Sequence, residues 1–399
     1  MQNHKLIKTP VAADRRRGII LVLAAALMIS ILAITALVVD LGYILVIRSQ
    51  MQTAADAAAL SAGMELSDGL GPGAIQTQSV TVTKAQSAGQ SVASSNRMLD
   101  RSTAFLSPSR DLTFGHRYYN NGLGKWDYQW GTAPFDTVKA TIRRDQAPAN
   151  ANAPTPADGS LKLFFAQALG NKTASYHSDA IATLKPAGGF RIIAGSNFTA
   201  EILPITLDQG SWNSLMNGVG TDQYAYDPVT GAVTTGADGI KEVSIYPNGS
   251  ANLPPGNRGT VDFGSANNST ADLSRQIRYG LNAYDLSFFP NSEIKFTNGI
   301  LIVNGDTGIS AAIKDDLDAI KGKPRAMPLF TAVSGPGNNA MYTLVKFVGV
   351  RIMFVRLTGS ASTKTVIVQP ATLVSKTAIA VNTGTGPGDS VFAPIRLVQ

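Results

Sequence analysis

Few residues in this 399-residue chain could carry out catalysis or bind a metal. Cysteine is absent, so a disulfide, a thiolate metal ligand and a cysteine nucleophile are all excluded. The three histidines, His4, His116 and His177, lie far apart in the sequence and offer little material for a histidine-rich metal site. The P-loop, zinc-protease, EF-hand and G-x-S-x-G patterns do not occur. A serine–histidine–aspartate site would show only as proximity in space. We therefore expect no enzyme activity and no cofactor.

Three segments combine acidic or amide side chains with glycine or with one another. NGDTG (304–308) offers oxygen ligands for calcium, but a turn that leads into a helix cap explains it better. DDLD (315–318) holds three carboxylates, which suit a solvated helix face better than a metal site. SGPGNNAMY (334–342) could cradle a phosphate or turn a hairpin, and the hairpin is favoured because no helix is expected after it. We expect no metal site in any of the three.

The net charge of +7 does not indicate nucleic-acid binding, because more than half of it lies at the N-terminus. The segment 1–17 carries +4, from five basic residues and one aspartate, and the rest of the chain carries only +3. A terminal cluster differs from the basic face or stripe that contacts nucleic-acid phosphates. Charged residues make up only 15% of the chain, which is common in extracytoplasmic β-rich proteins. No nucleic-acid partner is expected.

The basic cluster precedes an apolar segment that predicts a transmembrane helix. Gly18 to Val39 contains neither a charge nor a proline, and it is long enough to supply the roughly 20 apolar residues that span a bilayer. A cleavable signal peptide has a shorter apolar core followed by small residues, whereas Asp40-Leu41-Gly42-Tyr43 follows here. The span is therefore expected to be retained. The positive-inside rule places 1–17 in the cytoplasm and everything after Asp40 outside, in a single-pass inner-membrane topology.

Small residues within the span predict a surface for packing against another membrane helix. Ala26, Ser30 and Ala33 follow one another at spacings of four and three and so share one helix face. Ordinary membrane composition is the alternative explanation. Asp40, at the outer end of the span, is either a simple boundary residue or a contact with a partner helix.

The helix is predicted to continue beyond the membrane. Residues 41–66 contain no proline and place apolar residues at helical spacing. An unbroken helix over 18–66 would be about 70 Å long. Its outer half carries a row of small residues with an acid beside it, and these are Ala55, Asp56, Ala58 and Ala62. This surface either contacts a partner or packs the helix on its own sheet.

The segment 15–63 resembles the N-terminal domain of TadG-like proteins of the Tad (Flp) pilus-assembly system. The shared pattern is Arg-Gly, an apolar helix, Asp-x-Gly, an aromatic residue, Gln and then AADAAAL, and it falls at Arg17, Gly18, Asp40, Gly42, Tyr43, Gln52 and 54–60. The resemblance implies a membrane-anchored structural component of type IV-like pilus biogenesis, with pilin-like and platform proteins of the Tad system as partners. The alternative function is a membrane-anchored envelope-binding or adhesion protein that reuses this anchor and contacts the envelope or the cell surface.

Two departures from related patterns limit what the resemblance implies. Leu23 occupies the fifth position after Gly18, where substrates of prepilin peptidases carry Glu, so Met1 to Gly18 are expected to stay attached. Longer TadG-like proteins contain a von Willebrand A domain with an Asp-x-Ser-x-Ser metal motif. Asp285-Leu286-Ser287 lacks the second serine, so a short form without that domain is expected.

The whole chain is predicted to be α+β, with a transmembrane helix that extends into a pilin-like long helix, followed by extracytoplasmic mixed α/β and β-rich domains. The expected domains are a cytoplasmic basic tail (1–17), the transmembrane helix (18–39), a TadG-like pilin-like domain (40–187) and a β-rich extracytoplasmic α+β domain (188–399). The boundary is placed at Lys185-Pro186-Ala187-Gly188-Gly189. Strands are expected at 79–83, 112–119, 138–144, 179–184, 240–246, 299–303, 343–357 and 363–369, and helices at 84–99, 164–169, 273–281 and 309–321.

Overall fold

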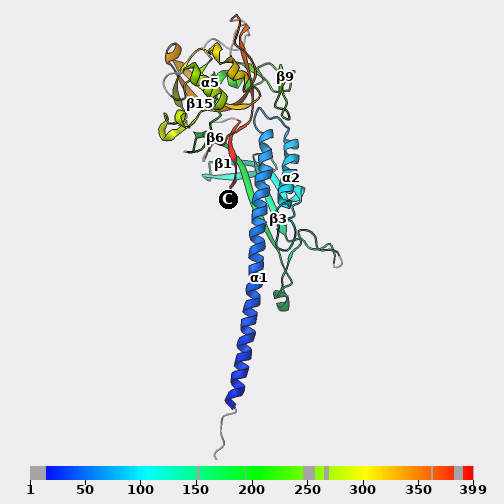
Figure 1. The fold of residues 1–399 in the computed structure, drawn as a ribbon. Helices are drawn as coiled ribbons and strands as arrows, with labels where there is room; N and C mark the ends of the chain where they lie inside the picture. The colour runs from blue at the N-terminus through cyan, green and yellow to red at the C-terminus, as the bar shows by residue number, and fades with distance from the viewer. Residues whose placement is uncertain are drawn as a thin grey trace, which may run out of the picture. The chain divides into compact units, whose positions relative to one another are not determined.

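The structure is a computed structural model that describes residues 15–150, 153–193, 195–245, 257–264, 269–360, 363–381 and 390–398 (Figure 1). Most of the predicted cytoplasmic tail therefore lies outside the described residues. The fold has the predicted α+β composition, with one long helix followed by strand-rich sheets. The chain forms two compact units. The first comprises Met1–Ala55, Ala93–Leu106 and Thr141–Asp179, and the second comprises Asp56–Val92, Ser107–Ala140 and Ala180–Gln399.

The helices and strands have the following bounds. The helices are α1 (Arg15–Glu65), η1 (Leu66–Gly69), α2 (Gln78–Ser94), α3 (Pro108–Asp111), η2 (Ala166–Leu169), α4 (Gln209–Met216), α5 (Thr270–Tyr279), α6 (Ala283–Leu286), η3 (Pro290–Ser292), η4 (Ala311–Ile313), α7 (Lys314–Asp318) and η5 (Gly337–Asn339). The strands are β1 (Leu112–Asn120), β2 (Lys125–Trp130), β3 (Thr137–Arg144), β4 (Leu161–Lys162), β5 (Thr173–Ala174), β6 (Tyr176–Arg191), β7 (Ile205–Asp208), β8 (Tyr224–Tyr226), β9 (Val233–Thr235), β10 (Val243–Ser244), β11 (Arg258–Val261), β12 (Glu293–Lys295), β13 (Leu301–Asp306), β14 (Pro324–Ser334), β15 (Ala340–Arg356), β16 (Thr365–Pro370), β17 (Leu373–Val374), β18 (Ala378–Ala380) and β19 (Val391–Val398).

Helix α1 is continuous over 51 residues, which confirms the predicted extension of the apolar span into a long helix. At 1.5 Å per residue it is about 75 Å long. The 3-10 turn η1 ends it within a few residues of the predicted end at Leu66. Gly71, with a φ of 75°, then turns the chain toward α2, in a left-handed conformation that favours glycine.

Residues 79–83 do not form the predicted strand, because they are the first turns of α2. The buried positions of this helix are Thr81, Ala85, Gly89 and Ala93, which recur every four residues and so lie on one helix face. The alternation of valine with threonine and serine suggests a strand over five residues. These residues form a helix instead, and its buried face consists of small residues. Hydropathy alone does not identify such a face, so the sequence pattern did not indicate the helix.

The eight-stranded sheet contains the strands predicted around 112–119 and 138–144, and its order is β17-β19-β6-β3-β1-β2, with β12 and β18 also paired to β6. Strand β6 is 16 residues long and continues across the predicted domain boundary at 187/188. Gly189 pairs with both β12 and β18, and the β18 register shifts beside it. The Pro- and Gly-rich segment is therefore an irregular stretch of strand rather than a linker.

The seven-stranded sheet has the order β10-β16-β15-β13-β11-β7-β14, and β14 also pairs with β15. Five strands, β15, β13, β11, β7 and β14, therefore close into a ring, in which only the β7–β14 pair is parallel. Strands β13, β15 and β16 confirm the strands predicted at 299–303, 343–357 and 363–369. Within the segment predicted as a strand at 240–246, only the two residues of β10 form one.

Helices α4, α5 and α7 contribute to a hydrophobic cluster of the second unit. Trp212, Ile277 and Leu317 pack in it with the ring-strand residues Leu329 and Val350. Helix α5 confirms the helix predicted at 273–281. The helix predicted at 309–321 is divided into η4 and the five-residue α7.

Candidate membrane anchor and helix-packing site

Residues 20–39 of α1 present mostly exposed apolar side chains to their surroundings. The most apolar 18-residue window has a mean hydropathy of 2.8, and none of it is buried by the rest of the protein. Ala26, Ser30 and Ala33 are all exposed here. The Ser30 hydroxyl donates to the carbonyl of Ala26 at 2.9 Å, so this polar group is satisfied within the helix. This half of α1 is long and apolar enough to cross a membrane, and its small-residue face is uncovered.

Asp40, where the uncharged run ends, is only 3% exposed, because a loop of the first unit covers it. Its carboxylate accepts hydrogen bonds from the backbone N–H groups of Phe164, Phe165 and Ala166 at 2.8, 3.0 and 2.7 Å. Three successive N–H groups that converge on one carboxylate form an anion-binding nest at the start of η2. Burial acts to raise the pKa of Asp40, but the three N–H bonds together outweigh it and hold the pKa below its ordinary value.

Further contacts within the first unit fix this part of α1. The rings of Tyr43 and Phe164 meet edge to face with centroids 5.0 Å apart. The Gln52 side-chain amide donates to the carbonyl of Asp179 at 3.1 Å. The N–H of Leu99 donates to the side-chain oxygen of Gln50 at 2.8 Å. Burial raises the pKa of the Tyr43 hydroxyl, and the nearby Asp100 carboxylate adds to the shift. Residues Asp40 to Gln52 are thus held by polar and aromatic contacts.

The outer half of α1 differs, because its small residues are covered by the chain itself. Ala55, Ala58 and Ala62 are completely buried, and Asp56 beside them is half-buried. Helix α2 approaches this row closely: a Cβ built on Gly89 would lie 3.3 Å from the Ala62 methyl and 3.4 Å from the Ala58 carbonyl oxygen. In the structure, these three alanines pack within the chain, and a partner contact through Asp56 stays a prediction.

The long helix also matches a known family. Residues 18–65 match the family model of Flp pilus-assembly TadE/G-like proteins. Over this range the N-terminal helix is similar to the TadE/G-like domain. The matched range begins with the apolar span, includes Asp40 and ends just after the buried alanine row. No curated protein and no solved structure matches the chain.

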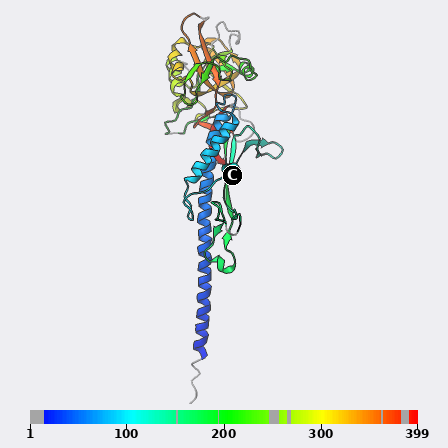
Figure 2. The same cartoon turned by 90° about the vertical axis from the view of Figure 1, so that its right-hand side faces the viewer.

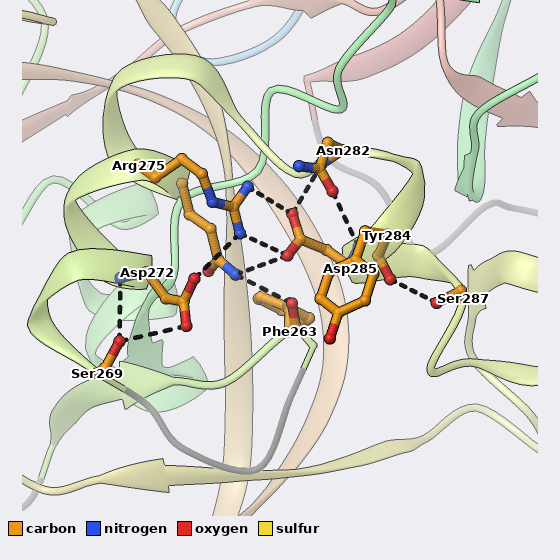
Figure 3. A network of polar contacts seen from close by, with 9 residues as sticks. Phe263, Ser269, Asp272, Arg275, Asn282, Tyr284, Asp285 and Ser287 are labelled. Carbon is orange, nitrogen blue, oxygen red and sulfur yellow. Dashed lines mark hydrogen bonds and ion pairs between the residues drawn. The ribbon is translucent and has the colours of Figure 1, made fainter. Parts of the chain in front are cut away.

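Outside the TadE/G-like domain, the acidic motifs form bonds within the chain. Both oxygens of Asp285 accept from the Arg275 guanidinium, at 2.6 and 2.9 Å, and one also accepts from the N–H of Asn282 at 2.8 Å (Figure 3). Asn282 in turn caps α6 by accepting from the N–H of Asp285. Asp285 therefore joins α5 to α6.

The other candidate segments are also accounted for structurally. Asp306 accepts from the N–H of Gly308 in a turn. In the DDLD segment, Asp316 forms an ion pair with Arg278, while Asp315 and Asp318 both pair with Lys314. Residues 335–339 connect β14 to β15, which confirms the predicted hairpin. Among the residues that the structure describes, no group of three or more histidine, aspartate or glutamate side chains could hold a metal ion.

A cleft of about 440 Å³ beside β1, β2 and β6 was not predicted from the sequence. Arg117 stacks on Trp126 at 4.3 Å from the ring centroid, and Lys185 also lines the cleft. Burial lowers the pKa of Lys185, and the charge of Arg117 adds to the shift. Burial raises the pKa of Asp136 to about 6, against hydrogen bonds from the Thr137 hydroxyl and the Arg117 N–H. The aromatic residues concentrated over 116–130, with Arg117 and Lys125 beside them, are the sequence signal that could have indicated this cleft.

Proposed function

We propose that the protein is a membrane-anchored structural component of Tad (Flp) pilus biogenesis. The observation that carries the proposal is the TadE/G-like match over 18–65 on a helix whose apolar half is entirely uncovered. In the proposed topology α1 crosses the cytoplasmic membrane once. The basic residues before the span keep the N-terminus in the cytoplasm, and the sheets lie outside.

The mechanism we propose is assembly rather than catalysis. In a bilayer, small residues let two helix backbones approach closely and gain van der Waals contact. Ala26, Ser30 and Ala33 offer such a face, and because the Ser30 hydroxyl is already bonded within α1, it needs no partner from another helix. Pilin-like or platform helices of the Tad system would pack here. The two extracytoplasmic sheets would contact pseudopilins, the pilus or the envelope.

Cysteine cross-linking tests this function directly, since the chain contains no cysteine of its own. Full-length variants with Ala33→Cys or Met28→Cys would be expressed with the pilus system and oxidised in membranes. Met28 is two positions from both Ala26 and Ser30, roughly half a helical turn, so it lies on the opposite side of α1 and serves as the matched control. We expect cross-links to pilin-like or platform proteins from position 33 and far fewer from position 28. Equal cross-linking from both positions, or none to any pilus protein, would contradict the proposal.

A reporter-fusion experiment tests the orientation separately. A reporter that is active only outside the cytoplasm should be active when fused after Gln399 and inactive when fused at residue 17. The reverse pattern would overturn the topology and with it the proposed role.

A further inference from the structure

We propose that the loop between β4 and β5 is a second membrane contact, which inserts side chains into the outer lipid interface of the bilayer that α1 crosses. We call residues 163–171 the apolar tip. The inference rests on the membrane anchoring in the proposed function but not on the pilus role. The partner that we propose for the apolar tip is lipid, at the boundary between the headgroups and the acyl chains of the outer leaflet.

The first argument is the position of the apolar tip along α1. The three N–H bonds to Asp40 hold the start of the apolar tip at the residue where the uncharged span ends. The edge-to-face contact between Tyr43 and Phe164 adds a second attachment within one helical turn. Both views show this green segment directly beside α1 (Figures 1 and 2). The apolar tip is therefore fixed at the depth where the helix leaves the hydrocarbon.

The second argument is the exposure of large apolar side chains. Phe164, Phe165 and Leu169 are 61%, 49% and 81% exposed, although all three lie within six residues. They add to the exposed apolar surface of α1, which continues past Asp40 at Leu41 and Leu45. Several large apolar side chains left exposed within a few residues of one another indicate a contact, and phenylalanine and leucine are typical of interfacial membrane segments.

The third argument is that the backbone of the apolar tip can enter a poorly hydrated layer at little cost. Its N–H groups bond within the chain: those of Phe164, Phe165 and Ala166 to Asp40, and those of Ala168, Gly170 and Asn171 to carbonyls of the apolar tip itself. Unsatisfied backbone groups are the main penalty for a loop near lipid, and here that penalty is largely removed. The exposed Lys162 and Lys172 flank the apolar tip and suit the phosphate level of the headgroups.

A fluorescence experiment on the full-length protein in liposomes tests the proposal. The liposomes contain phosphatidylcholine and phosphatidylglycerol, with or without phosphatidylcholine that carries a spin label near the top of its acyl chain. Leu169→Cys is labelled with an environment-sensitive fluorophore. The substitution removes little packing, because the native Leu169 side chain is mostly exposed. We expect blue-shifted emission and several-fold stronger quenching by the spin-labelled lipid than at the control position.

The control position is Leu99, an equally apolar residue of the same unit that is 59% exposed. Its N–H bonds to Gln50, ten residues and therefore about 15 Å beyond Asp40 along α1. A label at Leu99→Cys should show the emission of a water-exposed fluorophore and little quenching by the spin-labelled lipid. A third label at Leu32→Cys, in the middle of the span, reports insertion of α1 itself.

The outcomes separate the two proposals. Lipid quenching at positions 32 and 169 but not at 99 supports the lipid contact, and because only lipid and this protein are present, no pilus partner can account for it. Quenching at 32 with a water-exposed label at 169 overturns the lipid contact and leaves the proposed function intact. A water-exposed label at position 32 overturns both, because α1 would then not be inserted.

Discussion

The two halves of α1 carry similar rows of small residues in opposite environments. Ala26, Ser30 and Ala33 are exposed, whereas Ala58 and Ala62 are completely buried under the chain's own packing. Small side chains allow close backbone approach in both settings. What differs is the partner, which α2 supplies in the outer half, whereas the part of the chain that the structure describes covers none of the apolar window in the N-terminal half. A small-residue row therefore identifies a packing surface, and only the fold shows whether that surface is still free.

The largest effect is expected from enlarging the buried row. Ala58→Leu would force a branched side chain between α1 and α2, where the carbonyl of Ala58 already lies close to Gly89. We expect a loss of about 3 kcal/mol in the free energy of unfolding, the upper part of the usual range for overpacked sites. Thermal unfolding in detergent, protease resistance and protein abundance measure it. An unchanged unfolding midpoint would show that the two helices are not closely packed.

The second prediction contrasts two carboxylates, of which Asp136 has a raised pKa and Asp40 a lowered one. With a pKa of about 6 in the folded chain, Asp136 takes up its proton at higher pH than it does when unfolded, near 4. The folded state therefore gains about 3 kcal/mol as the pH falls from about 6 to about 4, and this contribution is absent above pH 6. Asp136→Asn should remove this contribution, and so make the pH dependence of the unfolding free energy shallower, while keeping an acceptor for Thr137. Urea unfolding of both proteins at pH values from about 4 to about 6 measures this contribution. The same pH dependence of the unfolding free energy in the variant would contradict the raised pKa of Asp136.

The third prediction is the matched counterpart of the first. Ala33→Leu adds the same volume in the membrane half, where the chain packs nothing against it. We expect the free energy of unfolding to change by less than about 0.5 kcal/mol, as for an ordinary surface site. Surface pili should nevertheless decrease at normal protein abundance, because a partner helix could no longer approach. Normal pili in this variant would remove the Ala33 face from the mechanism.

The smallest effect on global stability is expected at Asp40. Asp40→Asn removes the charge that three N–H groups share, so the amides of residues 164–166 should exchange with deuterium faster while those of β3 stay protected. In the unaltered protein, this contribution is complete above the unfolded pKa near 4 and is lost as the pH falls further, because the folded pKa is lower. Hydrogen exchange by mass spectrometry measures both effects. Unaltered exchange at 164–166 would show that the nest does not hold the loop.

The long helix could be predicted from the sequence because its signals are local. A charge-free run, the absence of proline and regular apolar spacing all lie within neighbouring turns of α1. The partner of Asp40 could not be predicted, since the three N–H groups that bind its carboxylate lie 124 to 126 residues away. Spacing along the chain carries no information about such a contact.

Two errors in the sequence-based prediction have the same physical origin. Residues 79–83 alternate as a strand would, yet α1 covers α2 through the small residues at every fourth position. Pro186 and Gly189 suggest a linker, yet β6 continues because β12, β18 and β19 pair along this stretch. In both cases a neighbour distant in sequence overrides local propensity.

The pairing of strands distant in sequence has a consequence for export. In the proposed topology the chain leaves the cytoplasm from the α1 end onward. The five-stranded ring can close only after β14 has been exported, because β7 pairs with β14 and β14 begins at Pro324. The pairing of β6 with β19 forms later still, because β19 begins only at Val391. The eight-stranded sheet therefore cannot be completed before β19 has crossed the membrane, so the strand edges that await it stay unpaired while the preceding segments are exported.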